Sequence, residues 1–221
     1  MRAVQYPLDI LPDASVLPQD YIVSECNHLL THTLTHASLL DTPVLLVLGA
    51  KGSGKTHLLH WLMAQRQIQK IDVGALGAYP AERWMKSGIC YAIDDAQAVA
   101  PEAALAQAIN HARASRAGLL LMMDAAFVPQ TPDLASRLQA AHRLIIPPPD
   151  DALRSALFIK RFADLQWRCD ADVMAYVLPR LPRDITSLQA FITRADREGL
   201  AQKRALTIPF AAHILAMMDT D

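Results

Sequence analysis

The sequence predicts an α/β fold, a parallel sheet flanked by helices, followed by a small all-α domain. Three observations lead to this prediction. Up to about residue 146, short apolar segments alternate with segments of helical periodicity, which is typical of a parallel sheet covered on both faces. A glycine-rich segment at residues 49–56 joins one predicted strand to a helix. Pro147-Pro148-Pro149 ends the alternation, and only helical patterns follow it.

The first part of the chain is predicted to hold five strands. Residues 1–20 contain three prolines and little periodicity, so we expect an extended tail. A helix is predicted over residues 25–39, and another follows the glycine-rich segment. The apolar, β-branched segments that predict strands lie at 43–48, 71–73, 89–93, 118–123 and 143–146. Pro101 is predicted in the first turn of a helix that ends near residue 115, where its missing N–H does no harm.

Four helices are predicted after the triple proline. Asp150 can cap the first, Asp170 the second, and Thr207 the fourth, which has a proline in its first turn. The third begins at Pro182-Arg183-Asp184 and ends near residue 199. The predicted organisation is therefore a tail (1–20), an α/β base (21–148) and a helical lid (149–221).

Composition excludes several classes of protein. With 52% hydrophobic and 19% charged residues, the 221-residue chain has the composition of a packed globular protein. Its formal net charge of −1 provides no general attraction to DNA or to acidic membranes. We expect neither a signal peptide nor a membrane span. The three cysteines (Cys26, Cys90, Cys169) are odd in number and far apart in the sequence, so we expect them to be reduced thiols of a cytoplasmic protein.

Residues Gly49 to Thr56 fit the phosphate-loop pattern G-x-x-x-x-G-K-[ST], and they lie between a predicted strand and a predicted helix. Gly49, Gly52 and Gly54 let the backbone curl so that successive N–H groups point at phosphate oxygens, and Ser53 lies among them. The helix N-terminus adds partial positive charge. Lys55 is expected to reach the β- and γ-phosphates, and the Thr56 hydroxyl to bind Mg²⁺. A glycine turn without a ligand is the alternative.

Two acids follow the predicted strand at 89–93, as in a Walker B motif. Asp94 would lie beside the phosphate loop, where its carboxylate can hold the Mg²⁺ water shell. Asp95 could orient or deprotonate an attacking water. Because acids often end strands, two solvated carboxylates are the alternative interpretation.

Other polar residues have less specific patterns. Asp124 ends the next strand and could contact a γ-phosphate or act only as a cap. Arg137 and Arg183 could bind phosphate oxygens with their planar fork, or form surface ion pairs. Histidines at positions 28, 32 and 36 have the spacing of a zinc site, but no carboxylate or cysteine cluster completes one.

These motifs together resemble the AAA+ domain of bacterial replication initiators of the DnaA type. The Walker A segment with His57-Leu58-Leu59-His60 and the Walker B segment Ile93-Asp94-Asp95-Ala96-Gln97 are similar to those of the initiators. Residues 132–138 resemble the box that carries the arginine finger, which places the finger at Arg137. Arg183 falls at the sensor 2 position. Residues 20–27 resemble the segment that wraps the adenine, which implies contacts from Tyr21 and Ile22.

The resemblance is strongest to Hda, the short DnaA homologue. The segment 205–215 is similar to its last helix, and the chain ends where an initiator would continue into a DNA-binding domain. Such proteins begin with a motif that binds the DNA polymerase sliding clamp. Gln5-Tyr6-Pro7-Leu8-Asp9-Ile10 lies in that place, with Gln5 and the apolar Tyr6, Pro7, Leu8 and Ile10 as anchors. The resemblance implies bound ADP or ATP with Mg²⁺, and stimulation of the hydrolysis of DnaA-bound ATP.

The expected activity is therefore that of a regulator of replication initiation with weak ATPase activity of its own. The strand end at Met122-Met123-Asp124-Ala125 lacks the polar residues usual at sensor 1, which implies slow hydrolysis. A DnaC/IstB-like helicase-loader or transposition-helper ATPase is the alternative, and a small-molecule P-loop kinase is a third. Basic and acidic residues are equal in number after residue 148, which argues against direct DNA binding. Self-association stays open.

Overall fold

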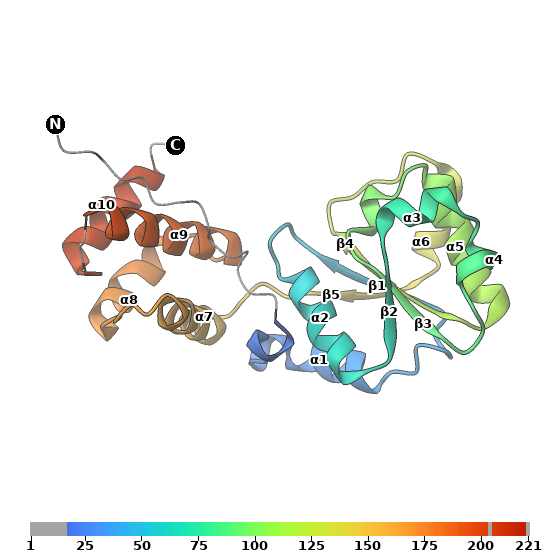
Figure 1. Cartoon of the computed structure of the whole chain (residues 1–221), viewed down its shortest axis with the longest axis horizontal. Helices are drawn as coiled ribbons and strands as arrows, with labels where there is room; N and C mark the ends of the chain where they lie inside the picture. Colours follow the sequence, from blue (N-terminus) through green and yellow to red (C-terminus); the bar gives the residue numbers. More distant parts are fainter. Residues whose placement is uncertain (1–16, 203–204, 220–221) are drawn as a thin grey trace. The chain divides into compact units, whose positions relative to one another are not determined.

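The structure is a computed structural model that describes residues 17–202 and 205–219. Figure 1 shows a sheet with helices around it and a separate group of helices formed by the C-terminal part of the chain. The strands are β1 (Val44–Gly49), β2 (Ile68–Ile71), β3 (Cys90–Ile93), β4 (Gly118–Asp124) and β5 (His142–Ile145). The helices that accompany them are α1 (Glu25–His36), α2 (Lys55–Gln65), α3 (Val73–Ala78), α4 (Ala81–Trp84), α5 (Glu102–Ser115) and α6 (Pro132–Gln139).

The five strands form one parallel sheet in the order β2-β3-β4-β1-β5. Its register pairs Gly49 at the end of β1 with Asp124 at the end of β4, and Ile93 at the end of β3 with Leu121. The carboxyl ends of β1, β3 and β4 therefore meet at one edge of the sheet. Polar residues that follow these strands are brought to this edge although they are far apart in the sequence.

Both faces of the central strands β1, β3 and β4 are buried, as expected for a parallel sheet covered on both sides. On β1, Leu45 and Val47 pack on the face covered by α1 and α2, whereas Val44 and Leu46 pack on the face covered by α3 to α6. Each of these side chains is less than 5% exposed. The alternation of contacts explains why the strand is apolar at every position instead of at every second one. None of the described helices is long and apolar enough to cross a membrane.

The position predicted for the second strand was wrong. The strand covers Ile68–Ile71 instead of residues 71–73, and Val73 begins α3. Asp72 is the N-cap of that helix, because its Oδ1 accepts a hydrogen bond of 2.7 Å from the N–H of Gly74. Capping fixes Asp72 outside the strand and turns the chain into a helix.

Several short elements were not predicted. Helices α3, α4 and α6 are four to eight residues long, too short for a clear periodic pattern. Pro18–Asp20, part of the predicted extended tail, forms the 3₁₀ helix η1. A second 3₁₀ helix, η2 (Ala96–Ala98), follows the Walker B acids. Helix α1 ends at His36, three residues before the predicted end.

Contacts divide the described residues into two units. One contains residues 17–21 and 27–147, and the other contains 22–26 with the C-terminal residues from 148. Within the second unit, the N–H of Cys26 donates to Asp150 Oδ2 at 3.2 Å. This unit is all-helical, with α7 (Asp151–Asp164), α8 (Ala171–Val177), the 3₁₀ helix η3 (Leu178–Arg180), α9 (Ile185–Gln202) and α10 (Ile208–Met218). Phe158, Phe162 and Phe191 are fully buried at its centre.

The predicted caps of these helices differ in how they act. Asp150 caps α7, since its Oδ1 accepts from the N–H of Leu153 at 2.6 Å. Asp170 and Thr207 precede α8 and α10 as predicted, but neither side chain makes a capping hydrogen bond. At α8 the N–H of Val173 instead donates to the backbone oxygen of Asp170. At α10, Pro209 removes one of the N–H groups that a cap would bind.

The buried carboxyl group of Asp196 on α9 makes this unit sensitive to pH. Its side chain is 4% exposed, and burial raises its pKa although a hydrogen bond with Trp167 partly opposes the shift. A raised pKa means that the folded state holds the proton more tightly, so stability falls as the pH rises above the ordinary range of an aspartate. We expect Asp196→Asn to raise Tm at pH 7–8 by roughly 2–4 °C, the shift that about 1 kcal/mol produces in a chain of this length.

Thermal unfolding followed by circular dichroism at a series of pH values measures this effect. The gain should vanish near pH 3, where the carboxyl group is protonated in the folded and the unfolded chain. Asp164→Asn is the matched control, because it makes the same change at an exposed carboxylate of the same unit, which lies 3.6 Å from Lys160. It should not raise Tm at about pH 7–8. An equal Tm for Asp196→Asn and the unaltered chain at pH 8 would contradict the argument.

Candidate functional site

The glycine loop between β1 and α2 has the backbone conformation that its pattern predicts. Gly52 (φ 74°) and Gly54 (φ 88°) are both left-handed, a conformation that side chains with a Cβ rarely adopt. Gly49 is required for a different reason, because a Cβ there would collide with Ser53 Oγ. Gly54 immediately precedes Lys55, the first residue of α2, so the loop ends at the N-terminus of an 11-residue helix.

Two buried polar groups in this loop are poorly compensated by the protein itself. Lys55 is only 8% exposed. Its Nζ donates to the carbonyl oxygens of Gly49 (2.8 Å) and Ala50 (2.9 Å). Among the described residues, no carboxylate forms an ion pair with this ammonium group. Ser53 Oγ is buried and has no hydrogen-bond partner among the described residues. A buried cation and an unpartnered hydroxyl group together favour an anionic oxygen ligand.

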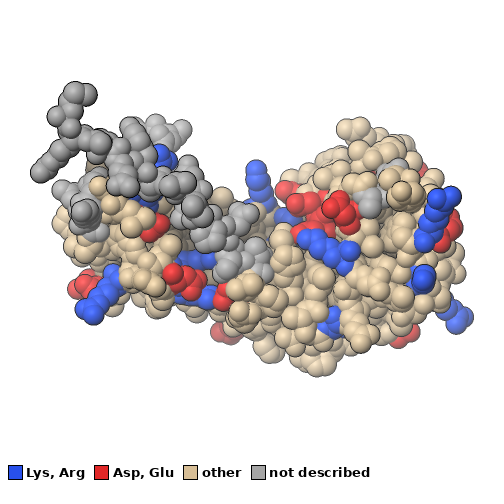
Figure 2. All heavy atoms as spheres, in the orientation of Figure 1, with Lys and Arg blue, Asp and Glu red and all other residues tan. Residues whose placement is uncertain are grey.

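The Walker B acids lie at the end of β3, at the same edge of the sheet. Asp94 is 9% exposed; its Oδ1 accepts from the N–H of Asp95 at 3.2 Å, and its Oδ2 lies 3.5 Å from the Nζ of Lys70 on β2. Asp95 is exposed and has a left-handed backbone (φ 48°, ψ 46°). In Figure 2, acidic side chains gather on this face of the base, with basic side chains next to them.

Gln97 connects the two strand ends. Its Nε2 donates to Asp95 Oδ1 at 3.1 Å, and its Oε1 accepts from the N–H of Asp124 at 3.1 Å. The carboxylate of Asp124 itself accepts from the N–H of Ala126 at 2.9 Å, so it stabilises the turn that follows β4. The contact with the N–H of Ala126 agrees with the interpretation of Asp124 as a cap. The carboxylate of Asp95 is oriented by its hydrogen bond with Gln97.

The segment expected to wrap an adenine is divided between the two units. Tyr21 belongs to the unit of the sheet, and its ring packs against His57 (centroids 5.4 Å apart) and Trp61 (5.3 Å) of α2. His57 Nε2 lies 2.9 Å from the carbonyl oxygen of Leu17. Ile22 belongs to the helical unit. The ring of Tyr21 therefore lies against α2, the helix that follows the glycine loop.

The two candidate arginines have different surroundings. Arg137 lies in the last turn of α6; its Nη2 is 2.8 Å from Asp133 Oδ1, and its side chain is 26% exposed. Its Nε is buried without a partner among the described residues. Arg183, in the helical unit, is 76% exposed and lies 3.0 Å from Asp151 Oδ2.

A second arginine in the helical unit is structural. Arg154 is 2% exposed, and its Nη2 donates to the carbonyl oxygens of Leu178, Leu181 and Pro182 at 2.9–3.2 Å. These contacts hold the residues just before Arg183 against α7. Asp151 also lies 3.4 Å from Arg154 Nη1, so one exposed carboxylate is shared by the buried and the exposed arginine.

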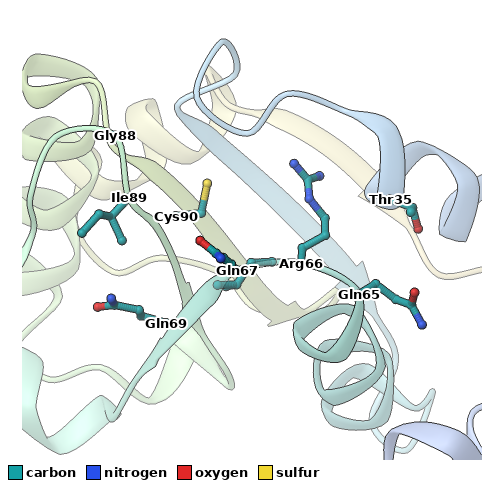
Figure 3. A pocket seen from close by; sticks show the side chains of 9 residues that line it. Thr35, Gln65, Arg66, Gln67, Gln69, Gly88, Ile89 and Cys90 are labelled. Atoms are coloured by element: carbon teal, nitrogen blue, oxygen red, sulfur yellow. The ribbon is translucent and has the colours of Figure 1, made fainter.

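Two features away from this edge have structural explanations. A pocket of about 770 Å³ lies at the amino-terminal ends of β2 and β3. Figure 3 shows Arg66 among the side chains that line it. Arg66 Nη1 donates to the carbonyl oxygens of Leu34 (2.8 Å) and Ala37 (2.6 Å), so this arginine caps α1. The histidine rings at 28, 32 and 36 stack along α1. Among the described residues, no group of three potential ligands could hold a metal ion.

The sequence did not suggest two of the residues in this site. Lys70 lies on the strand whose position was wrongly predicted, and its pairing with Asp94 depends on the register of β2 and β3. Gln97 was part of a motif, but its bridging role depends on the left-handed backbone of Asp95. The predicted clamp-binding residues 5–10 lie outside the described part of the chain.

Comparisons with known proteins agree with this architecture. Residues 151–215 match the family model described as "Hda, lid domain". An uncharacterized protein of Haemophilus influenzae is 27% identical over 230 aligned residues, which cover 97% of this chain and 98% of the relative.

Solved structures share the fold at low sequence identity. Domain III of the Thermotoga maritima replication initiation protein DnaA has a TM-score of 0.67 at 16% identity, covering 92% of this chain and 97% of that domain. The AMPPCP-bound DnaA of Aquifex aeolicus has a TM-score of 0.59 at 18% identity, with 86% and 69% covered. The Holliday junction motor RuvB of Thermotoga maritima has a TM-score of 0.65 at 14% identity, with 90% and 71% covered. The predicted AAA+ fold with a helical lid is confirmed.

Proposed function

We propose that this chain is a DnaA/Hda-type AAA+ protein related to replication initiation, which binds ADP or ATP with Mg²⁺ and acts as a regulator of initiation. The observation that carries the proposal is the match of the lid to the Hda lid model, together with a buried Lys55 in the glycine loop whose ammonium group donates to carbonyl oxygens. Two relatives of the same fold are described as bound to AMPPCP, a nucleotide analogue.

The proposed roles of the residues follow from their chemistry. Lys55 Nζ would exchange its two carbonyl acceptors for phosphate oxygens, and the backbone of Gly49, Gly52 and Gly54 would let N–H groups surround them. Ser53 Oγ would donate to the same oxygens. Thr56 and Asp94 would hold Mg²⁺, which would neutralise phosphate charge when bound.

Other residues would contact the adenine, a phosphate group and the attacking water. Tyr21 and Ile22 would contact the adenine, and Arg183, which is exposed, would contact phosphate from the lid. Asp95, oriented by Gln97, would position a water in slow turnover of the protein's own nucleotide.

The proposed target is the nucleotide of a partner. Arg137 would supply positive charge to the ATP of a neighbouring DnaA molecule, as an arginine finger does in trans. Its side chain is 26% exposed, and its ion pair in the described part of the chain is with Asp133 on the same helix. Ion pairs between residues four apart on a helix contribute about 0.3–0.5 kcal/mol when exposed, so a partner's phosphate could compete with Asp133 for this arginine. Stimulated hydrolysis of DnaA-bound ATP would restrain re-initiation in the cytoplasm.

The nucleotide that the protein carries tests this proposal against the DnaC/IstB-like ATPase, the second candidate. The oriented carboxylate of Asp95 favours that candidate, because it is what a self-contained ATPase requires. The purified protein should retain ADP and turn over ATP more slowly than about 0.01 s⁻¹ alone, far below the typical range of enzymes. Steady turnover of about 1 s⁻¹ or more without DnaA would favour the ATPase and count against the regulator.

The N-terminal tail is proposed to bind the DNA polymerase sliding clamp through Gln5, Tyr6, Pro7, Leu8 and Ile10. Gln5→Ala removes the polar anchor of the motif, and we expect it to weaken clamp binding about tenfold or more, the effect of losing one or two hydrogen bonds at an interface. Isothermal titration calorimetry with purified clamp measures the change. Gln19→Ala, in the same predicted tail but outside the motif, is the control and should bind like the unaltered chain; equal affinity for the Gln5 and Gln19 variants would remove the clamp proposal.

A further inference from the structure

The carboxylate expected to hold Mg²⁺ already has a cation beside it. Lys70 lies on edge strand β2, where the register pairs it with Ala92 of β3. Side chains two residues apart on a strand point to the same face, so Lys70 and Asp94 lie on one face as diagonal neighbours. Lys70 Nζ is 3.5 Å from Asp94 Oδ2, and the two side chains are 37% and 11% exposed.

Both oxygens of the Asp94 carboxylate therefore have donors from the protein itself. Oδ1 accepts from the N–H of Asp95, and Oδ2 faces the ammonium group of Lys70. The neighbouring Asp95 carboxylate accepts a hydrogen bond from Gln97, which is a neutral side chain. A lysine ammonium carries three donors and one positive charge, so it can satisfy a carboxylate at the place where a divalent ion would otherwise be needed.

We propose that Lys70 is a resident counter-cation of the nucleotide site, which substitutes in part for Mg²⁺ at Asp94 and makes nucleotide affinity nearly independent of Mg²⁺. The inference rests on the proposed nucleotide binding. The physical reason is that Mg²⁺ approaching Asp94 must displace the ammonium group of Lys70 or be repelled by its positive charge. Such a site suits a protein whose own nucleotide is structural instead of hydrolysed.

The test compares the affinity for ADP in two buffers, one with about 5 mM Mg²⁺ and one with EDTA. The affinity is measured by titration of a fluorescent ADP analogue. For the unaltered chain, the two dissociation constants should agree within about threefold, a difference below 1 kcal/mol. Lys70→Gln keeps the length and polarity of the side chain but removes its charge. We expect it to weaken ADP binding in EDTA and to restore Mg²⁺ enhancement, raising the ratio of the two constants about tenfold.

Three further variants make the result specific. Lys70→Arg keeps the cation and should behave like the unaltered chain. Lys86→Gln removes the charge of an exposed lysine elsewhere in the base and should also behave like it. In an Asp94→Asn background, Lys70→Gln should no longer change the ratio, because the carboxylate that the two cations share is gone. Mn²⁺ electron paramagnetic resonance, which counts bound metal directly, should show tighter Mn²⁺ binding for Lys70→Gln with ADP.

The outcomes separate this inference from the proposed function. ADP binding with strong Mg²⁺ dependence in the unaltered chain, or an unchanged ratio in Lys70→Gln, overturns the role of Lys70 and leaves nucleotide binding intact. No ADP binding in either buffer overturns the nucleotide site, and the role of Lys70 with it.

Discussion

Replacing Arg137 by alanine is expected to abolish the stimulation of DnaA-bound ATP hydrolysis, lowering the stimulated rate by about a thousandfold or to the rate of DnaA alone. An arginine supplied in trans contributes on the order of 10³–10⁵ to such a reaction, because it stabilises the charge that develops on the phosphoryl oxygens. Arg137 lies at the end of α6, and its partner Asp133 is one turn away on the same helix. Single-turnover hydrolysis of labelled ATP preloaded on DnaA measures the rate.

The matched control for this variant is Arg83→Ala. Arg83 is an exposed arginine on α4, so its replacement changes the net charge of the base equally. It should leave the stimulated rate unchanged within about twofold. Thermal unfolding of the Arg137 variant checks that α6 still packs through the buried Leu134 and Leu138. Full stimulation by a folded Arg137→Ala chain would exclude this residue as the finger.

The second large effect is expected from Lys55→Ala, which should weaken ADP and ATP binding by at least about a hundredfold. Each hydrogen bond to a charged group contributes roughly 1.5–3 kcal/mol, and Lys55 has the position to make two to phosphate oxygens. Its ammonium group is buried, and the contacts it makes in the described part of the chain are with carbonyl oxygens, which do not neutralise its charge. Isothermal titration calorimetry measures the two dissociation constants.

Lys51→Ala is the control in the same loop. Lys51 is exposed and precedes Gly52, so its loss removes one positive charge near the phosphates without removing the buried group. We expect it to weaken binding by less than about fivefold, as for an exposed charge screened by solvent. Lys55→Met, which keeps the aliphatic chain, should behave like Lys55→Ala; unaltered affinity in both variants would mean that the loop binds no nucleotide.

The central strands could be predicted because their composition reports their burial. β1 is apolar at every position and β4 is apolar up to its last residue, Asp124, and each buries side chains on both faces of the sheet. The edge strand β2 was placed wrongly because its middle residues, Gln69 and Lys70, are exposed and break the apolar pattern. The short helices α3 and α4 have too few turns for a periodic signal.

The glycine loop and the Walker B acids could be located because each motif is contiguous. Their partners could not, since those depend on backbone geometry between distant segments. Lys70 meets Asp94 only through the register of β2 and β3. Gln97 meets Asp124 only because β4 lies next to β3 and Asp95 turns the chain through a left-handed conformation. The Arg137–Asp133 pair follows from helix α6, whose spacing of four residues brings the two side chains together.

The lifetime of DnaA-bound ATP tests the central claim most directly. DnaA loaded with labelled ATP is mixed with the ADP form of this protein and with sliding clamp loaded on DNA, and the remaining labelled ATP is followed over time. The account predicts that the ATP disappears at least about a hundredfold faster than with DnaA alone, and that omitting the clamp slows this loss. An unchanged lifetime of DnaA-bound ATP, with ADP demonstrably bound at the glycine loop, would contradict it.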